Sequence, residues 1–183
     1  PVLVDEVYLD AVFDRGGRPA STHSPNLLSS NSLTKSHGLS SLRCGWTLAS
    51  PELTGRIRRA RDVVDVSGPI PAERLAHLAF QNLDRLLQRA RRIVEPNQRL
   101  LRESLAAWEP LECAPFAATI AFPRFRDGRD AGPFTARLFE RHGVAVVPGA
   151  FFGLPSHFRI SLGGEPEAFR EGIEVIGRSL SEA

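Results

Sequence analysis

The alternation of hydrophobic and polar residues in the first third of the chain predicts short strands joined by polar loops. Residues 1–4 form an apolar run that ends at Asp5 and Glu6, which indicates the end of a buried strand with acids just past its carboxyl edge. Two further segments have weaker strand character because Ser, Asn or Gly interrupts them. These segments are 26–32 and 45–49.

Helices are predicted in the middle third. Ser50, Pro51 and Glu52 combine a capping hydroxyl, a proline at the first helical position and an acid in the first turn, and this helix extends to about residue 64. After a break at 67–71, apolar residues recur at steps of three, four and five and predict the clearest helix of the chain. They are Leu75, Leu78, Leu83, Leu86, Ala90 and Ile93. Pro96 is expected to kink or end this helix, and another helix covers 97–108.

Strand and helix patterns mix in the last third. The predicted strands are 116–125, 144–147 and 158–162, and the predicted helices are 134–142, closed by Gly143, and 166–180. The last helix places Phe169, Ile173, Ile176 and Leu180 on one face. The pattern therefore predicts the end of an α/β sheet domain over 1–66, a long helical connection over 67–109 and an α+β unit over 110–183.

Composition is that of an ordinary globular protein, with 42% hydrophobic and 24% charged residues among 183. No run of eighteen apolar residues is present, so no membrane helix is expected. A net charge of +2 gives no argument for nucleic-acid binding. Two cysteines, Cys44 and Cys113, do not make a disulfide framework, so a reducing, cytoplasmic location is expected.

The two types of basic residue occur in very unequal numbers: 22 are arginine and one, Lys35, is lysine. The sequence also lacks methionine and opens with proline inside an apolar strand. We therefore expect it to be a piece of a longer protein.

One segment carries a specific motif, in which serine, lysine, glycine, arginine and glycine follow at fixed offsets. These residues are Ser32, Lys35, Gly38, Arg43 and Gly45. About thirty residues earlier, Asp5 to Tyr8 give the pattern Asp-Glu-x-Tyr at a strand end. The two segments together resemble the pyridoxal-phosphate enzymes of the aspartate aminotransferase superfamily, class I and II.

The resemblance gives each of these residues a role that suits its chemistry. Lys35 is the amine that would hold the aldehyde of pyridoxal 5'-phosphate and act as the catalytic acid and base. Ser32 and Arg43 would donate hydrogen bonds to the cofactor phosphate. Asp5 would keep the pyridine nitrogen protonated, and Tyr8 would lie near the ring hydroxyl. Such ligands sit where the strands of an open α/β sheet end.

A second, looser match lies near the end of the chain. Residues 149–153 followed by 157–161 resemble the family's C-terminal segment, where an arginine on a strand grips the substrate α-carboxylate. Arg159 is the matching position. A two-pronged contact between arginine and carboxylate fixes orientation as well as affinity.

By resemblance, the fold is the later part of an aspartate-aminotransferase-like large domain plus a C-terminal α+β small domain. The implied activity is transfer of an amino group between an amino acid and a 2-oxo acid in a homodimer. Two alternatives stay open. The same lysine motif serves carbon–sulfur lyases, decarboxylases and synthases, and a truncated product would fold without chemistry.

Each candidate residue also has a purely structural interpretation. Lys35 could be an ordinary surface lysine, Asp5 a turn acid, Tyr8 a packing residue and Arg159 a salt-bridge partner. Several other residues are interpreted structurally: His37 as a packing residue, Cys44 as a small hydrophobe, Arg124 and Arg126 as solvated strand-end charges, and the arginine runs at 56–59 and 89–92 as solvated helix faces. His157, close to Arg159, is left open between the two.

Overall fold

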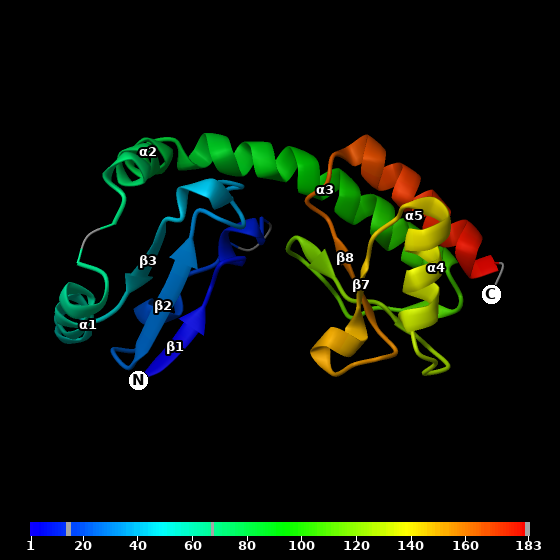
Figure 1. Cartoon of the computed structure of the whole chain (residues 1–183), viewed down its shortest axis with the longest axis horizontal. Coiled ribbons are helices and arrows are strands. Elements are labelled where there is room, and N and C mark those ends of the chain that lie inside the picture. Colours follow the sequence, from blue (N-terminus) through cyan, green and yellow to red (C-terminus); the bar gives the residue numbers. More distant parts are fainter. Residues whose placement is uncertain (14–15, 67, 182–183) are drawn as a thin grey trace. The chain divides into compact units, whose positions relative to one another are not determined.

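The computed structural model describes residues 1–13, 16–66 and 68–181, which fall into two compact units, Pro1–Ala90 and Arg91–Ala183 (Figure 1). One long helix continues from the first unit into the second. The three-part division predicted from sequence stays a prediction. Its helical connection begins at Ser67, and Ser67 lies outside the described residues, as do the last two residues of the chain.

The first unit is built on three strands that lie side by side in Figure 1: β1 (Val2–Asp5), β2 (Leu27–Ser32) and β3 (Gly45–Leu48). β2 is central, parallel to β1 and antiparallel to β3. These strands confirm the predicted segments, but the burial expected of the first one is wrong. Val2 is 60% and Leu3 64% exposed, because β1 is the edge strand of the described sheet.

Hydrogen bonds to neighbouring turns explain the polar character of β2. The Ser29 hydroxyl accepts from the Ser21 N–H at 3.0 Å, and the Asn31 amide donates to Asp10 at 2.9 Å. Both side chains are buried, so these bonds offset the cost of taking polar groups out of water. The bonded residues lie in or beside short 3₁₀ helices. These are η1 (Leu9–Ala11) and η2 (Ala20–Thr22), and η3 (Ser40–Leu42) follows β2.

Three helices follow the sheet: α1 (Pro51–Val64), α2 (Ile70–Phe80) and α3 (Leu83–Ala107). The Ser50 hydroxyl accepts from the Leu53 N–H, which confirms the predicted cap. The prediction of one helix through 75–93 is wrong. The step of five between Leu78 and Leu83 marks the break between α2 and α3. Here the Asn82 side-chain amide donates to the Leu78 carbonyl, and the Asn82 carbonyl accepts from the Leu86 N–H in the first turn of α3.

Pro96 lies inside α3 and does not end it. Proline removes one backbone donor, but buried side chains on either side hold the helix against the second unit. They are Val94, Asn97, Gln98 and Leu101. The separate helix expected at 97–108 is therefore the second half of α3.

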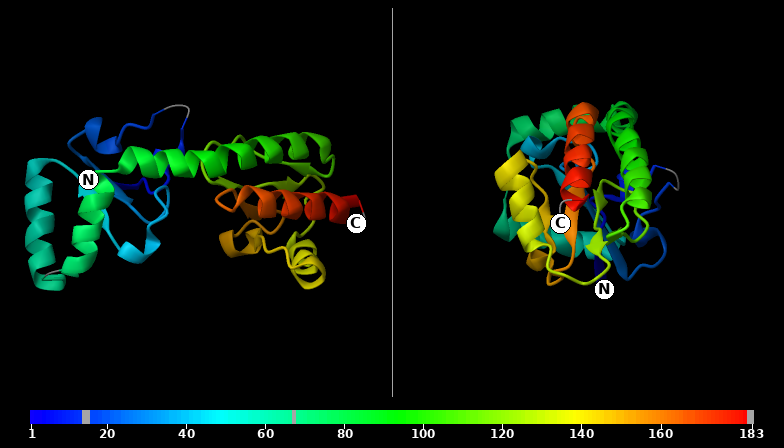
Figure 2. Two further views of the ribbon diagram at one scale, coloured as in Figure 1. Left: turned by 90° about the horizontal axis from the view of Figure 1, so that it is seen from above. Right: turned by 90° about the vertical axis from the view of Figure 1, so that its right-hand side faces the viewer.

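In its described residues, the second unit contains short strands, two further α-helices and one 3₁₀ helix. Its strands are β4 (Leu111–Glu112), β5 (Ile120–Ala121), β6 (Arg124–Phe125), β7 (Val147–Pro148) and β8 (Phe158–Ser161), and its helices are α4 (Gly132–His142), η4 (Gly149–Phe152) and α5 (Pro166–Ser181). β8 is central between β5 and β7 and antiparallel to both. Figures 1 and 2 show α5 alongside the second half of α3.

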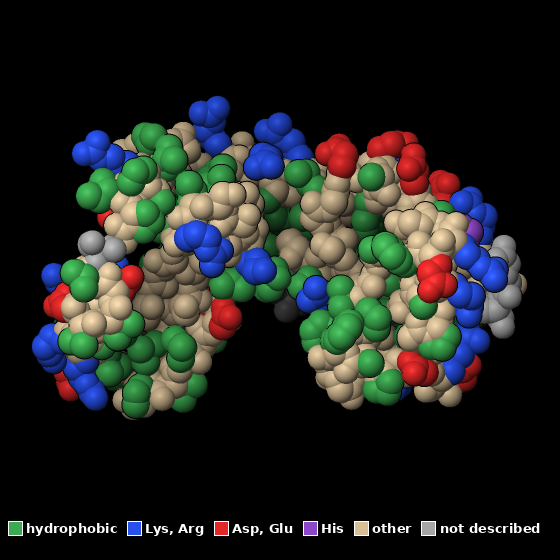
Figure 3. Space-filling model, viewed as in Figure 1, with side chains coloured by type: hydrophobic (Ala, Val, Ile, Leu, Met, Phe, Trp, Pro, Cys, Tyr) green, Lys and Arg blue, Asp and Glu red, His purple; other side chains and the backbone are tan. Residues whose placement is uncertain are grey.

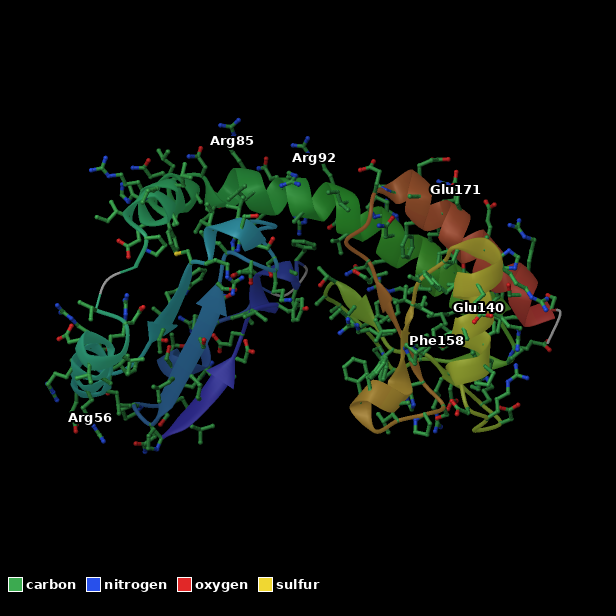
Figure 4. The ribbon with its side chains drawn as sticks, in the orientation of Figure 1. Arg56, Arg85, Arg92, Glu140, Phe158 and Glu171 are labelled. Carbon is green, nitrogen blue, oxygen red and sulfur yellow. The ribbon has the colours of Figure 1, made fainter. Side chains whose placement is uncertain are left out.

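The core of this unit contains three phenylalanine rings from two strands and a helix. Phe125, Phe134 and the Phe158 labelled in Figure 4 lie with ring centroids 5.4–6.1 Å apart. Helices 134–142 and 166–180 and the strand 158–162 are confirmed, and Gly143 closes α4 with φ 67°. Within the described residues, no helix has the length and apolar character needed to cross a membrane.

Two other predicted strands are mostly wrong. The segment 116–125 contains two strands of two residues each, because Pro123 between them has no N–H for a ladder. Of the segment 144–147, only the last residue belongs to a strand, namely β7. The Val144 N–H instead donates to the Leu138 carbonyl and completes the end of α4.

Two consecutive amide side chains of α3 hold the backbone of this unit. Asn97 donates to the carbonyls of Leu162 and Gly164 at 3.0 and 2.8 Å. Gln98 donates to those of Ala117 and Ala118 at 3.0 and 2.7 Å. These four bonds fix α3 to the segments that enter β5 and leave β8.

Substitution Asn97→Leu is expected to lower the free energy of unfolding by about 1–3 kcal/mol. The leucine has a similar volume but leaves the buried Leu162 carbonyl without its donor. Denaturant titration measures the loss as a lower midpoint of unfolding. The slope of the unfolding free energy against denaturant concentration should stay the same. A change below about 0.5 kcal/mol would show that water replaces the amide.

Candidate active site

The lysine lies on a loop that its own backbone closes. β2 ends at Ser32, and the Leu39 N–H then donates to the Leu33 carbonyl at 2.9 Å, while the Gly38 N–H donates to the Lys35 carbonyl at 3.1 Å. Gly38 has φ 70°, a left-handed conformation that favours glycine. The Lys35 side chain is exposed at this turn, and within the described residues no hydrogen bond or ion pair is recorded for its ammonium group.

The core of the first unit lies beneath this loop. Leu33 is fully buried against Ala76 and Ala79 of α2. Partly buried residues of the loop, of β3 and of α3 complete the cluster: Leu39, Leu42, Cys44, Trp46, Leu83 and Leu86. The hydrophobic cluster anchors both ends of the loop, so its position does not depend on the exposed turn. Cys44 is a free thiol packed on this cluster, as expected.

A buried hydroxyl ties the lysine loop to the segment after β1. The Ser36 hydroxyl donates to the Val7 carbonyl at 3.0 Å, and the Glu6 N–H donates to the Ser30 carbonyl at 2.7 Å. Asp5 pairs in register with Ser30, and the Val7 N–H donates to its Oδ1 at 3.2 Å. The two motif segments therefore follow neighbouring parallel strands and are held together there.

A cavity of about 510 Å³ lies against the sheet of the first unit. Asp5, Ser32 and Arg43, three of the residues singled out from sequence, line it. Lys35 and Tyr8 are not among its lining residues. Tyr8 is half-buried at the start of η1, where its carbonyl accepts from the Ala11 N–H.

The lining of this cavity includes hydroxyl and guanidinium donors. The hydroxyls of Ser32 and Thr34 lie 2.6 Å apart, and both residues line the cavity with Arg43. Arg43 has φ 50° and ψ 34°, an uncommon conformation for a residue other than glycine, and its Nη1 donates to the Ser40 carbonyl. Sequence reasoning missed Thr34, although a second hydroxyl two residues after Ser32 was a readable signal.

His37 packs beneath the lysine loop and is 3% exposed. Its ring contacts Trp46 edge-on at 6.4 Å, and its Nδ1 has no hydrogen-bond partner among the described residues. Burial lowers the pKa of His37, and this outweighs the opposite effects of the Asp10 charge and of a backbone hydrogen bond with Ser32. The imidazole is thus neutral at pH 7 and packs as expected.

The stability of the protein is expected to fall as pH drops below 6.5, the ordinary pKa of histidine. The unfolded chain takes up a proton on His37 near that pH, whereas the folded chain does so only at lower pH, so acid favours unfolding. Substitution His37→Phe keeps a ring against Trp46. In this variant the free energy of unfolding should change less between pH 7 and pH 5 than in the unmodified protein. Substitution of the exposed His23 by Gln is the control. An unchanged slope in His37→Phe would contradict the assignment.

Arg159 is the central residue of a separate group in the second unit. It lies on β8 opposite Val147 of β7, and its guanidinium carbon is 5.3 Å from the centre of the Phe152 ring. No ion pair of Arg159 is recorded within the described residues. Arg124 and Arg126 instead both pair with Glu112, so they are engaged surface charges rather than free ones. His157 stacks on Phe122 with centroids 4.8 Å apart.

The arginine runs are only partly solvated helix faces. Arg56 of the first run and Arg92 of the second, labelled in Figure 4, point away from the body of their units, as expected. Arg58 of the first run, however, lines the cavity of about 510 Å³, and a guanidinium nitrogen of Arg89 would lie 3.7 Å from a Cβ on Gly38, so these two arginines face the candidate site rather than solvent alone.

Comparison with known proteins gives one family. The model of the family described as aminotransferase class I and II matches residues 1–176. A capreomycidine synthase of Streptomyces vinaceus is 33% identical over 98% of this chain and 47% of its own length. Histidinol-phosphate aminotransferase 2 of Pseudomonas aeruginosa is 32% identical over 98% and 47%.

The solved structures agree. A PLP-dependent aminotransferase from Streptococcus suis superposes with a TM-score of 0.89 at 26% identity, covering 98% of this chain and 48% of the other. The chain thus spans about half the length of the relatives it matches. Its fold is that of the aspartate aminotransferases, and family members depend on pyridoxal phosphate, which confirms the fold and the cofactor expected from the motif. The chain belongs to the class I and II aminotransferase family.

Proposed function

We propose that this chain is part of an enzyme that transfers an amino group between an amino acid and a 2-oxo acid with pyridoxal 5'-phosphate. One observation carries the proposal. Asp5, Ser32 and Arg43 line a single cavity, and the loop that leaves Ser32 presents Lys35, the one lysine of the chain. The family supports the cofactor, and amino transfer is favoured by the similarity to relatives named histidinol-phosphate aminotransferases.

The residues of the cavity fit the cofactor in charge and hydrogen bonding. Asp5 is a carboxylate with one oxygen held by the Val7 N–H, which leaves the other for a protonated ring nitrogen. The hydroxyls of Ser32 and Thr34 and the guanidinium of Arg43 are donors that suit a phosphate. Tyr8, on the segment after Asp5, is assigned to the ring hydroxyl.

When bound, pyridoxal phosphate supplies an electron sink for the bonds at the substrate α-carbon. The Nζ of Lys35, which is exposed on a closed loop, would hold the cofactor and would move the α-proton of the substrate. Asp5 would keep the ring nitrogen of the bound cofactor protonated. Arg159 binds the substrate carboxylate, since its guanidinium has no acidic partner among the described residues.

The test is an absorbance spectrum of the whole protein with added pyridoxal phosphate, followed by assays with 2-oxoglutarate or pyruvate as acceptor. A visible band that borohydride removes, together with a new amino acid formed from the acceptor, supports the proposal. Absence of the band overturns the cofactor role of the cavity. A band without amino transfer overturns the reaction assignment alone.

The second candidate is another pyridoxal-phosphate reaction on the same scaffold. It is favoured by the similarity to a capreomycidine synthase, whose name does not denote an aminotransferase. The lysine loop serves both candidates, because both begin with the same amine. Release of ammonia or carbon dioxide, or formation of a product without any 2-oxo acid acceptor, would favour this candidate.

We also propose that the whole protein is a cytoplasmic homodimer, as the family resemblance implies. Sedimentation equilibrium measures the mass directly. A mass of one chain at micromolar concentration would contradict the dimer.

A further inference from the structure

The alternation of β8 separates a buried face from a face that carries Arg159. Phe158 is fully buried and Ile160 is 4% exposed, so both point into the core of the second unit. Arg159 lies between them and points to the opposite face. The antiparallel pairing of Ala121 with Ile160 places Phe122 opposite Arg159 on one side, and Val147 pairs with it on the other.

The 3₁₀ helix η4 covers this face of β8, and its geometry requires glycine at its first position. A Cβ on Gly149 would lie 2.2 Å from the Leu154 carbonyl oxygen and 2.5 Å from that of His157. The Gly149 N–H donates to the His157 carbonyl at 2.8 Å, and the Leu154 N–H donates to the Gly149 carbonyl at 3.0 Å. The backbone of η4 is therefore fixed to the start of β8.

Two rings hold the Phe152 ring in place over the guanidinium. Phe152 meets Phe122 edge-to-face with centroids 5.5 Å apart, and Phe122 stacks on His157. Arg159 lies 5.3 Å from the Phe152 centroid, within the range of a cation–π contact. The contacts run in series from Arg159 through Phe152 and Phe122 to His157, so His157 packs on a ring that contacts Phe152.

The neighbouring phenylalanine provides a contrast. Figure 3 shows hydrophobic side chains gathered over η4, where Phe151 is 79% and Phe152 48% exposed. Among the residues that the structure describes, no ring or arginine contact of Phe151 is recorded, whereas Phe152 has both. Of these two adjacent phenylalanines, only Phe152 contacts the Arg159 guanidinium.

We propose that Phe152 is a positioning residue: its ring, braced by Phe122, holds the Arg159 guanidinium in the orientation that binds the carboxylate of the substrate. This inference rests on the proposed function of Arg159. The guanidinium carbon lies over the Phe152 ring, and this contact limits the rotamers of Arg159, so less freedom is lost when the carboxylate binds. Within the described residues no hydrogen bond or ion pair of the Arg159 guanidinium is recorded, so its N–H groups are available to form a fork with a carboxylate.

Comparison of Phe152→Leu with Phe151→Leu in the cofactor-loaded whole protein tests the inference. Phe152→Leu should raise KM for the amino acid about fivefold, as expected for loss of a cation–π contact, with kcat nearly unchanged. Phe152→Tyr keeps the ring and should restore KM. Phe151→Leu should leave KM unchanged.

Direct binding gives a readout independent of turnover. Isothermal titration of 2-oxoglutarate into cofactor-free whole protein should show a weaker Kd in Phe152→Leu by a similar factor and no change in Phe151→Leu. Equal effects of the two leucine variants, a loss confined to kcat, or failure of tyrosine to restore KM overturn the inference. If the unmodified protein shows neither the borohydride-sensitive band nor 2-oxoglutarate binding, the proposed function fails first and this inference falls with it.

Discussion

The variant Lys35→Ala is expected to lose the covalent attachment of pyridoxal phosphate and to lose activity by at least about 10²–10⁴-fold. The activity estimate is that of removing a positioned general acid and base, since a methyl group carries no proton. In the unmodified protein, borohydride should fix the cofactor on the peptide that contains Lys35, which mass spectrometry detects as an added mass. The variant should bind the cofactor weakly and reversibly through its remaining contacts.

A matched control lies six residues away on the same segment. Ser41 is exposed and no contact of its hydroxyl is recorded within the described residues, so Ser41→Ala should keep the fixed label and the activity. A borohydride-fixed label that persists in Lys35→Ala would assign the attachment to an amine other than the one lysine of this chain. That result would mean that the lysine loop has a structural role and does not hold the cofactor.

Features fixed by a few adjacent residues were predictable from sequence. The Ser50 cap of α1 and the Gly143 end of α4 depend on bonds within four or five residues, and both are present. The lysine motif is of the same kind. Its glycine at position 38 supplies the left-handed turn that closes the loop around Lys35.

Contacts between distant segments were not predictable, even where the residue types were informative. The polar residues of β2 weakened the strand prediction, yet Asn31 bonds to Asp10 across 21 positions. Ser36 holds the lysine loop through the Val7 carbonyl, 29 positions away. A hydroxyl or an amide in a sequence indicates that a partner is needed, but the fold selects the partner.

In the candidate site, too, the sequence motif predicted some residues, whereas others became evident only from contacts in the fold. Asp5, Ser32 and Arg43 were named from the motif, and the structure brings them to one cavity. Thr34, which the motif did not include, joins them through a contact of its hydroxyl with that of Ser32. Among 22 arginines, sequence offered many alternatives to Arg159, and ion pairing separates it from Arg124 and Arg126.

The variant Arg159→Ala is expected to raise KM for amino-acid substrates about 10- to 150-fold while the cofactor still binds. A two-pronged contact between a guanidinium and a carboxylate is worth about 1.5–3 kcal/mol, which corresponds to that range. The cofactor should be unaffected, because the residues proposed to hold it lie on β1, β2 and the lysine loop. Titration of pyridoxal phosphate by absorbance and steady-state kinetics with the amino acid measure the two affinities separately.

Arg124→Ala is the matched control, since Arg124 also lies on a strand of the second unit but pairs with Glu112. It should change KM by less than about twofold, as expected for a surface ion pair. Arg159→Lys sharpens the test, because lysine keeps the charge but cannot form two parallel bonds to a carboxylate. Recovery of most of the affinity by lysine would mean that charge alone suffices. Equal weakening of cofactor and substrate in Arg159→Ala would instead make Arg159 a structural residue, because a ligand of the substrate carboxylate has no reason to affect both.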